Sequence, residues 1–152
     1  MFARRILLPT IANRNLLTKA TFSTKKKYLP ETHEWIEITD DNNARMGITN
    51  HAQNKLGEIS FVELPGIGHE FEEGNEVVAI ESTKAVGEVQ MPIDGIITSI
   101  NEEVSNDATL INKDPENKGW LFCFKFDSSQ INSLQKKLVD LKEYKIQIEN
   151  ED

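Results

Sequence analysis

The chain has 152 residues and a hydrophobic content of 38%, which suffices for one compact domain with a modest core and not for two. The net charge of −8 argues against nucleic-acid binding, which requires clustered positive charge. The single cysteine, Cys123, excludes an internal disulfide and a cysteine-based metal site, and its apolar neighbours predict a buried thiol.

The first 27 residues differ in composition from the rest of the chain. They hold seven basic residues and no acidic residue, together with several Ser, Thr and Leu residues. This composition predicts a mitochondrial targeting segment over residues 1–27 that is removed, and a basic tail without a targeting role is the alternative. Pro9 and Arg14 interrupt any secretory apolar core, and the apolar stretch is too short to span a membrane. In the remainder, ten basic residues stand against all 25 acidic ones, a net charge of −15 that favours steering onto basic partner surfaces.

Residues 28–127 are predicted to form one mainly β domain. Residues 34–38 alternate polar and apolar side chains as a half-buried strand does. Further strands are predicted at residues 44–48, 58–64, 76–81, 86–91, 96–100 and 120–126. Thr49 or Asn50 offers an N-cap for a short helix over residues 50–56, which Gly57 ends. Many short strands joined by turns predict a sandwich or a flattened barrel.

The C-terminal region has a different period. Ile131, Leu134, Leu138 and Leu141 recur at intervals of three and four residues, which predicts an amphipathic helix within residues 128–147. Its apolar stripe is expected to pack on the sheet, with docking of a partner as the alternative. Residues 148–152 are expected to fray.

One lysine stands out between two predicted strands. Lys84 lies in Glu81-Ser82-Thr83-Lys84-Ala85, where a tight turn would make it reachable from all sides. Such a position suits a residue that enters another enzyme's active site and is modified there. A solvated hairpin lysine is the plainer alternative.

The sequence shows little that could support catalysis by this chain itself. It contains no glycine-rich nucleotide loop and no convincing Ser/His/Asp set. His33, His51 and His69 are scattered without metal-like spacing, so no metal site is expected. Trp35 and Trp120 are expected to be core aromatics.

The segment from Tyr28 to Lys145 resembles the H protein of the glycine cleavage system, a family of lipoyl carriers. The resemblance is carried by the order and spacing of short motifs: Thr32-His33-Glu34-Trp35, Gly47-Ile48-Thr49-Asn50-His51-Ala52-Gln53, Leu56-Gly57-Glu58, Phe61-Val62-Glu63-Leu64-Pro65, Glu81-Ser82-Thr83-Lys84-Ala85, Met91-Pro92-Ile93-Asp94-Gly95, Leu110-Ile111-Asn112, Asp114-Pro115 and Gly119-Trp120-Leu121. The chain departs from the family at Thr83, where Val is usual, and at Val86 and Gly87, where hydroxyl residues are usual.

The resemblance implies a lipoyl/biotinyl-type fold, a barrel-sandwich hybrid, with lipoic acid joined to Lys84 as an amide. It implies that lipoylating enzymes read Glu81, and that Thr32, Glu34 and Glu88 line a cleft that shelters the aminomethyl-loaded arm. The family's carriers visit a pyridoxal-phosphate glycine decarboxylase (P protein), a tetrahydrofolate-dependent aminomethyltransferase (T protein) and dihydrolipoyl dehydrogenase (L protein). The expected location is the mitochondrial matrix, with no catalysis by this chain and no nucleic-acid or membrane partner.

The sequence leaves other functions open. One is a lipoyl relay, or a carrier for other lipoyl enzymes such as the 2-oxo acid dehydrogenases, although the chain lacks their Ala/Pro-rich linker. Another is a structural or interaction module in which Lys84 stays unmodified. A biotin carrier is disfavoured, because biotin carriers present their lysine between two methionines and this chain has Thr83 and Ala85 at those positions.

Overall fold

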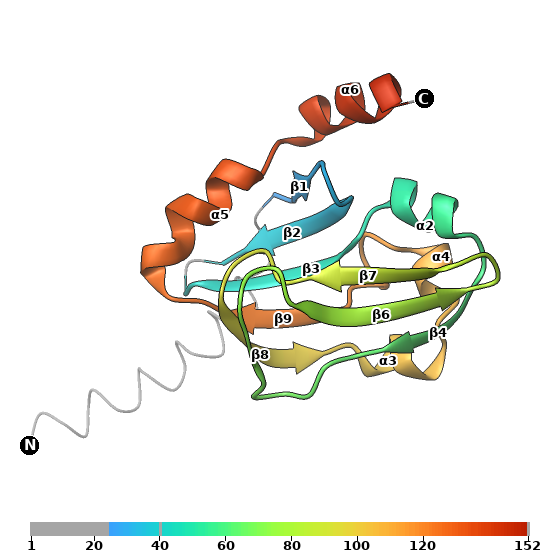
Figure 1. Cartoon of the computed structure of the whole chain (residues 1–152), viewed down its shortest axis with the longest axis horizontal. Coiled ribbons are helices and arrows are strands. Elements are labelled where there is room, and N and C mark those ends of the chain that lie inside the picture. Colours follow the sequence, from blue (N-terminus) through green and yellow to red (C-terminus); the bar gives the residue numbers. More distant parts are fainter. Residues whose placement is uncertain (1–24, 40, 152) are drawn as a thin grey trace, which may run out of the picture.

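The protein is built from two antiparallel sheets that face each other (Figure 1). The computed structural model describes residues 25–39 and 41–151, so most of the predicted targeting segment, residues 1–24, lies outside the described residues. The larger sheet has the strand order β1-β2-β3-β9-β8-β5 and the smaller one the order β4-β6-β7. The mainly β sandwich is therefore confirmed. The alternative of a flattened barrel is wrong, because no strand pairing within the described residues joins the two sheets.

The strands agree well with the alternating segments of the sequence. The larger sheet contains β1 Lys27–Leu29, β2 Glu34–Ile38, β3 Asn43–Ile48, β5 Glu70–Phe71, β8 Gly95–Ile100 and β9 Phe122–Lys125. The smaller sheet contains β4 Ile59–Glu63, β6 Glu76–Ser82 and β7 Val86–Gln90. The short strands β1 and β5 were not predicted, because two or three residues carry too little alternation to be recognised.

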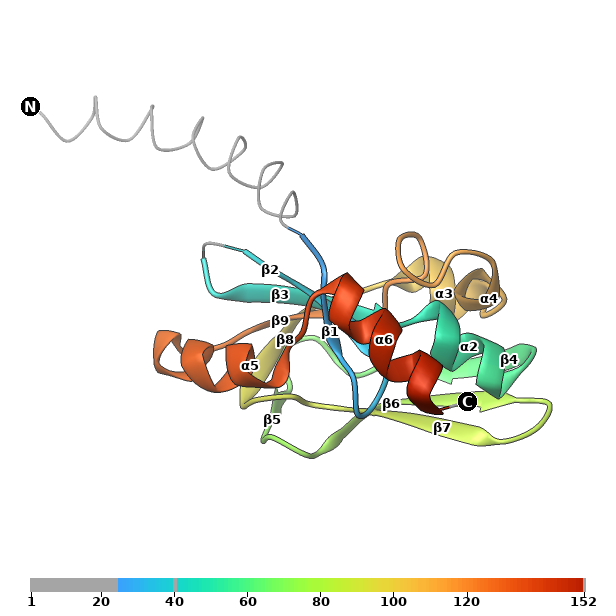
Figure 2. The same ribbon diagram turned by 90° about the horizontal axis from the view of Figure 1, so that it is seen from above.

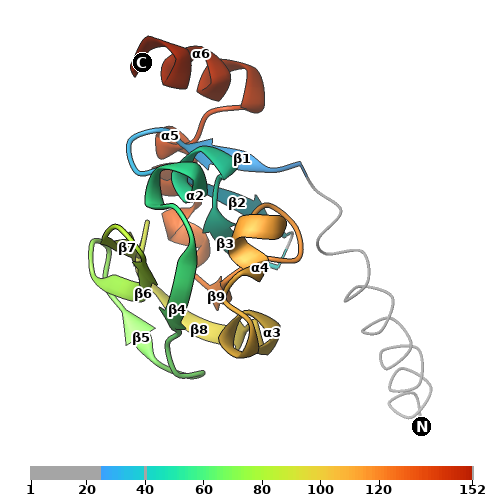
Figure 3. The ribbon, with the colours of Figure 1, turned by 90° about the vertical axis from the view of Figure 1, so that its right-hand side faces the viewer.

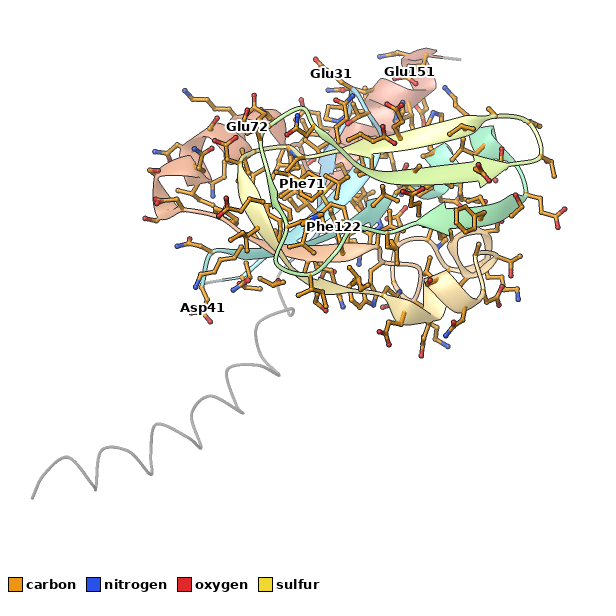
Figure 4. All side chains as sticks on the ribbon, turned by 60° about the horizontal axis from the view of Figure 1, so that its bottom comes forward. Glu31, Asp41, Phe71, Glu72, Phe122 and Glu151 are labelled. Carbon is orange, nitrogen blue, oxygen red and sulfur yellow. The ribbon has the colours of Figure 1, made fainter. Side chains whose placement is uncertain are left out.

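The core fills the space between the sheets, and a smaller aromatic cluster lies on the outer side of β1 and β2. Phe122 and Phe124 are fully buried, and Figure 4 shows Phe122 in the interior. The smaller cluster consists of Tyr28, Trp35 and Tyr144, with Trp120 packed against it. Trp35 thus has the core role predicted for it, whereas Trp120 is only partly buried and packs against the edge of this cluster.

The helix α2, Asn50–Leu56, forms as its capping residues predict. The hydroxyl of Thr49 accepts the backbone N–H of Ala52 at 3.2 Å. At the other end Gly57 has a φ of +80°, a value that favours glycine, and its N–H donates to the Gln53 carbonyl at 3.0 Å. Two further short helices, α3 Glu102–Asn106 and α4 Leu110–Lys113, lie between β8 and β9.

The C-terminal segment differs from the expected single helix over residues 128–147. A 3₁₀ turn, η1 Ser128–Gln130, leads into α5 Ile131–Lys137, and Leu138 is then extended. The next residue, Val139, exchanges two backbone hydrogen bonds of 2.9 Å with Tyr28. This added pairing at the edge of β1 breaks the helix, and the chain resumes as α6 Leu141–Glu151, which crosses over β1 toward α2 (Figure 2).

The expected fraying is also wrong for residues 148–151, because α6 continues to Glu151, and residue 152 lies outside the described residues. The buried ring of Tyr144 stacks on Tyr28 with a centroid distance of 4.8 Å, which anchors α6 to the sheet. Figure 3 shows α6 as an outer layer beside β1.

The folded region begins slightly earlier than Tyr28. Lys27 is the first residue of β1, and the Lys26 ammonium lies 3.9 Å from a Glu37 carboxylate oxygen and 5.0 Å from the Trp35 ring centroid. Residues 26 and 27 therefore contact the domain, although their basic composition groups them with the targeting segment.

Candidate functional site

Lys84 is displayed on the turn that joins β6 to β7. Figure 1 shows this hairpin at the end of the molecule where α2 and α4 lie. The Ser82 hydroxyl accepts the backbone N–H groups of Lys84 and Ala85 at 3.2 and 3.1 Å and donates to the Ala85 carbonyl at 3.0 Å. The Thr83 N–H donates to the Glu58 carbonyl at 3.1 Å. The backbone of the turn is thus fixed by local hydrogen bonds while the lysine itself is exposed.

The base of the hairpin packs closely on the end of α2. A Cβ at Gly57 would lie 3.4 Å from the Lys84 Cε, so the lysine stem runs over this glycine. On the same side, a Cβ at Gly87 would lie 3.1 Å from a Leu56 methyl group. The departure from the family pattern at Gly87 therefore has a local reason, because a residue without a side chain lets β7 approach Leu56.

A side chain to which the sequence analysis assigned no role of its own holds this corner together. The Asn112 amide donates to the Gln53 side chain at 2.8 Å and to the Gly57 carbonyl at 2.9 Å. Its oxygen accepts the Ile59 N–H at 2.9 Å. Asn112 thereby joins α4, the end of α2 and the start of β4 directly beneath the Lys84 stem.

Glu81 lies in a row of exposed side chains across the smaller sheet. The strand register places it directly between Phe61 and Val86, which are 51% and 64% exposed. An acid flanked by two accessible apolar side chains, three residues before the lysine, forms a surface that a modifying enzyme could read.

A cleft of about 520 Å³ lies between the β1–β2 turn, the end of β7 and the C-terminal segment. Its walls come from regions far apart in the sequence: Leu29, Pro30, Glu31, Thr32, Glu34, Glu73, Gly74, Gln90, Met91, Pro92, Lys136, Lys137 and Val139. Two of the predicted arm residues, Thr32 and Glu34, line this cleft. The contribution of Lys136 to Val139 was not predicted, because it depends on the pairing of Val139 with Tyr28.

Glu34 is a buried acid with an unpaired oxygen. Its side chain is only 2% exposed, and its Oε2 has no hydrogen-bond partner within the described structure. Burial raises the pKa of Glu34 to about 7, although a hydrogen bond from Thr32 acts in the opposite direction. A buried carboxyl that faces a cleft with a free acceptor is suited to receive a cationic donor.

Glu88 is not among the residues that line this cleft, so its predicted role beside Glu34 stays a prediction. It lies on β7 opposite Ala79 and is exposed. Because side chains alternate along a strand, Glu88 shares a face with Gln90, which does line the cleft, but it lies two residues nearer the lysine. The cleft and Lys84 are thus connected by one face of β7, with Glu88 between them.

Two of the histidines expected to be scattered meet in the fold. The rings of His33 and His51 have a centroid distance of 4.6 Å, and both Nε2 atoms lie close to the Glu151 carboxylate. The sequence could not indicate this, because the three residues come from a turn, from α2 and from the end of α6. His69 stays apart, with its ring against Phe71.

The thiol of Cys123 is buried as predicted, and burial raises its pKa to about 11. The one cysteine of the chain is therefore an unreactive part of the interior. No helix in the described part of the chain is both long and apolar enough to cross a membrane.

Comparison with known proteins gives a consistent result. The family model described as glycine cleavage H-protein matches residues 27–151. The glycine cleavage system H protein of Thermotoga maritima is 48% identical over 98 residues, covering 64% of this chain and 78% of that protein. The probable glycine cleavage system H protein 1, mitochondrial, of Dictyostelium discoideum is 37% identical over 128 residues, covering 84% of this chain and 82% of that protein.

A solved structure supports the fold directly. The crystal structure of a glycine cleavage system H protein from Mycobacterium marinum aligns with a TM-score of 0.66 at 30% sequence identity. The alignment covers 79% of this chain and 93% of that one.

Proposed function

The chain belongs to the glycine cleavage H-protein family, and we infer from this that it is the lipoyl carrier of a glycine cleavage system. We propose that lipoic acid is attached to Lys84, and that the chain carries cargo between enzymes without catalysing a reaction itself. The observation that supports the attachment best is the exposure of Lys84 on a turn whose backbone is fixed by Ser82. A rigid turn presents the amine to a modifying enzyme at little cost in conformational entropy.

The residues around Lys84 are compatible with a covalently attached lipoyl group. The exposed Lys84 amine can form the amide, and Glu81, between Phe61 and Val86, is the acid that we assign to recognition by lipoylating enzymes. When bound, the lipoyl group supplies a strained cyclic disulfide that accepts the aminomethyl group of glycine and is later reoxidised.

We propose that the cleft lined by Thr32 and Glu34 shelters the loaded end of the arm. Val86, Glu88 and Gln90 share one face of β7, and this face runs from the Lys84 turn to the cleft. An arm that follows this face is directed toward the cleft, where the unpaired Oε2 of Glu34 can accept a hydrogen bond from a protonated amine.

This assignment favours glycine cleavage over the other carrier functions. The cargo of a 2-oxo acid dehydrogenase is an acyl group without a cation, so it gains nothing from a buried carboxylate with a free acceptor. The raised pKa of Glu34 shows that the fold tolerates a costly group at this position. A relay role in lipoate transfer would use Lys84 and Glu81 alone and does not require Glu34.

The proposed partners follow from membership of the system. They are the P-protein decarboxylase, the T-protein aminomethyltransferase, the L-protein dehydrogenase and the lipoylating enzymes. The proposed location is the mitochondrial matrix, which is supported by the acid-free basic composition of residues 1–24 and by relatives named as mitochondrial in Dictyostelium discoideum and Arabidopsis thaliana. The strongly acidic remainder of the chain suits encounter with basic enzyme surfaces.

Intact-mass measurement of the native protein tests the attachment. The native chain should carry one lipoyl increment, and Lys84→Arg should carry none while retaining the native melting temperature. Lys118→Arg, a change at another exposed lysine, is the matched control and should be lipoylated normally. An unmodified native protein, or a lipoyl increment on Lys84→Arg, would show that the proposal is wrong.

A further inference from the structure

His33, His51 and Glu151 come together from three separate parts of the fold. None of them lines the cleft that contains Thr32 and Glu34. His33 lies in the turn before β2, His51 in the first turn of α2, and Glu151 at the end of α6. The Glu151 Oε2 is 3.3 Å from the His33 Nε2 and 3.5 Å from the His51 Nε2. Figure 4 shows Glu151 at the same edge of the molecule as Glu31 of the β1–β2 turn.

We propose that these three side chains form a binding site for a divalent transition metal of the zinc class. The candidate ligand atoms all lie within 4.8 Å of one another. An ion held tetrahedrally at 2.0–2.1 Å places neighbouring ligand atoms about 3.3–3.4 Å apart. The two histidine-to-carboxylate separations are close to this value, and the two imidazole nitrogens, which lie within 4.8 Å of one another, would move together on binding.

The surroundings of the cluster are those of a prepared site. The His33 Nδ1 is bonded to the Tyr144 hydroxyl at 2.9 Å, and that hydroxyl is bonded to the Thr49 hydroxyl at 2.8 Å. Partners of this kind fix the ring and direct the other nitrogen toward a metal. His33 also has a φ of +64°, an uncommon backbone conformation for a residue other than glycine, and the turn holds it there.

A second observation points to a missing ligand. The His51 Nε2 is buried and has no hydrogen-bond partner among the described residues. Buried polar atoms are normally satisfied, so an unpartnered imidazole nitrogen facing a carboxylate is an exception that a bound ion would remove.

The ligand set determines the class of ion. Two imidazoles and one carboxylate are the set of many zinc sites that leave one position open, whereas calcium and magnesium prefer oxygen ligands. The Glu151 side chain is 38% exposed, so solvent can supply the fourth ligand. Bound metal would fasten α6 to α2 and to the β1–β2 turn.

Lys55 provides an internal competitor for the ion. Its ammonium lies 3.6 Å from the Glu151 Oε2 and occupies one side of the same carboxylate. The Lys55 side chain is 56% exposed and can move into solvent when a metal binds. Removal of the Lys55 ammonium should therefore strengthen metal binding. If the cluster served only as a set of ion pairs, the same removal would instead lower its stability.

Titration of the full chain, produced without lipoate, tests the site with Zn²⁺ by calorimetry and with Co²⁺ by visible absorbance. Residues 1–24 contain no His, Cys, Asp or Glu, so they add no competing ligand of these types. We expect one ion per chain and a rise in melting temperature on addition of Zn²⁺. His51→Ala should weaken binding at least about 100-fold, and Tyr144→Phe, which frees the His33 ring, about 10-fold or more.

The control variants distinguish a metal site from a simple ion-pair cluster and from weak binding elsewhere on the surface. His69→Ala should bind as the native protein does, Glu151→Gln should bind more weakly, and Lys55→Met should bind about two- to fivefold more tightly. Glu151 lies at the end of the last helix, so its substitution leaves the core intact. The proposal is overturned if native protein binds Zn²⁺ no better than His51→Ala, or if Lys55→Met fails to bind more tightly.

Discussion

Replacement of Glu34 by Gln should stabilise the protein and at the same time impair its function as a carrier. The carboxyl is 2% exposed, and burial raises its pKa from 4.5 to about 7. A difference of about 2.5 pKa units corresponds to about 3 kcal/mol between the two protonation states. Gln keeps the shape of the side chain without the charge, so the comparison isolates the cost of the buried carboxylate.

The sign of the effect on stability follows from proton binding. Between the two pKa values the folded protein holds a proton on Glu34 that the unfolded chain has released. Stability therefore falls as the pH rises from about 4.5 to about 7 and changes no further above that range. Glu34→Gln should match the native protein near pH 4.5 and exceed it by up to about 3 kcal/mol at pH 8, a rise in melting temperature on the order of 10 °C.

Denaturant unfolding at several pH values measures this difference. Glu31→Gln is the matched control, because Glu31 lines the same cleft but is exposed, and its curve should follow that of the native protein at every pH. Parallel curves for native protein and Glu34→Gln would refute the reasoning, since they would show that water reaches the carboxyl.

The functional effect should have the opposite sign. A charge-assisted hydrogen bond to the cargo amine contributes about 1.5–3 kcal/mol, so its loss should speed release of ammonia and formaldehyde from purified loaded protein about 10- to 100-fold. Lipoylation of Lys84 should be unchanged, and so should acceptance of an uncharged acyl cargo. Equal release rates for native protein, Glu34→Gln and Glu31→Gln would exclude a role for Glu34 in holding the amine.

Three further predictions test other parts of the structure. Asn112→Ala should lower the free energy of unfolding by about 1–3 kcal/mol, because the Gly57 carbonyl and the Ile59 N–H lose their partner, whereas the exposed Asn117→Ala should have little effect in the same denaturant assay. Glu88→Gln should speed loss of the aminomethyl group less than about threefold, as expected for an exposed charge, and an effect as large as that of Glu34→Gln would show that the arm rests on Glu88. Residues 1–30 fused to a fluorescent reporter should direct it to mitochondria, and a diffuse cytosolic signal would contradict the targeting role.

The features that the sequence predicted well are those governed by local rules. The Thr49 cap, the end of α2 at Gly57 and the turn at Lys84 each depend on residues within a few positions of one another. The alternation of Phe122, Phe124 and Phe126 likewise places three rings on one buried face. Such features need no knowledge of the rest of the fold.

The features that it missed depend on the docking of distant segments. The break between α5 and α6 arises where Val139 pairs with Tyr28, although the apolar spacing from Ile131 to Leu141 is that of one continuous helix. Docking of this C-terminal segment also adds Lys137 to the wall of the cleft that Glu34 lines. It brings Glu151 of α6 to His33 and His51. No periodicity within either segment records these contacts.

The strand β2 shows why one acid of the candidate site could not be distinguished from another. The sequence predicts a half-buried strand, yet Glu34, Trp35, Ile36 and Glu37 are all buried. Ile36 on one face belongs to the main core, and Trp35 on the other face is covered because Tyr144 of α6 packs with it. The two acidic residues of this strand, Glu34 and Glu37, are therefore buried on opposite faces and do not contact bulk water.

The two acids of β2 differ in whether the fold supplies a partner. Glu37 accepts a hydrogen bond from the Arg45 guanidinium at 2.8 Å and has Lys26 at 3.9 Å, so its charge is compensated by neighbouring side chains. Glu34 has one oxygen without a partner within the described structure and faces the cleft. A buried carboxylate that is already paired stabilises the folded state, whereas one left unpaired costs free energy until a ligand arrives. This difference in pairing, and not burial alone, is the reason that we propose Glu34 as the acid that receives the cargo amine.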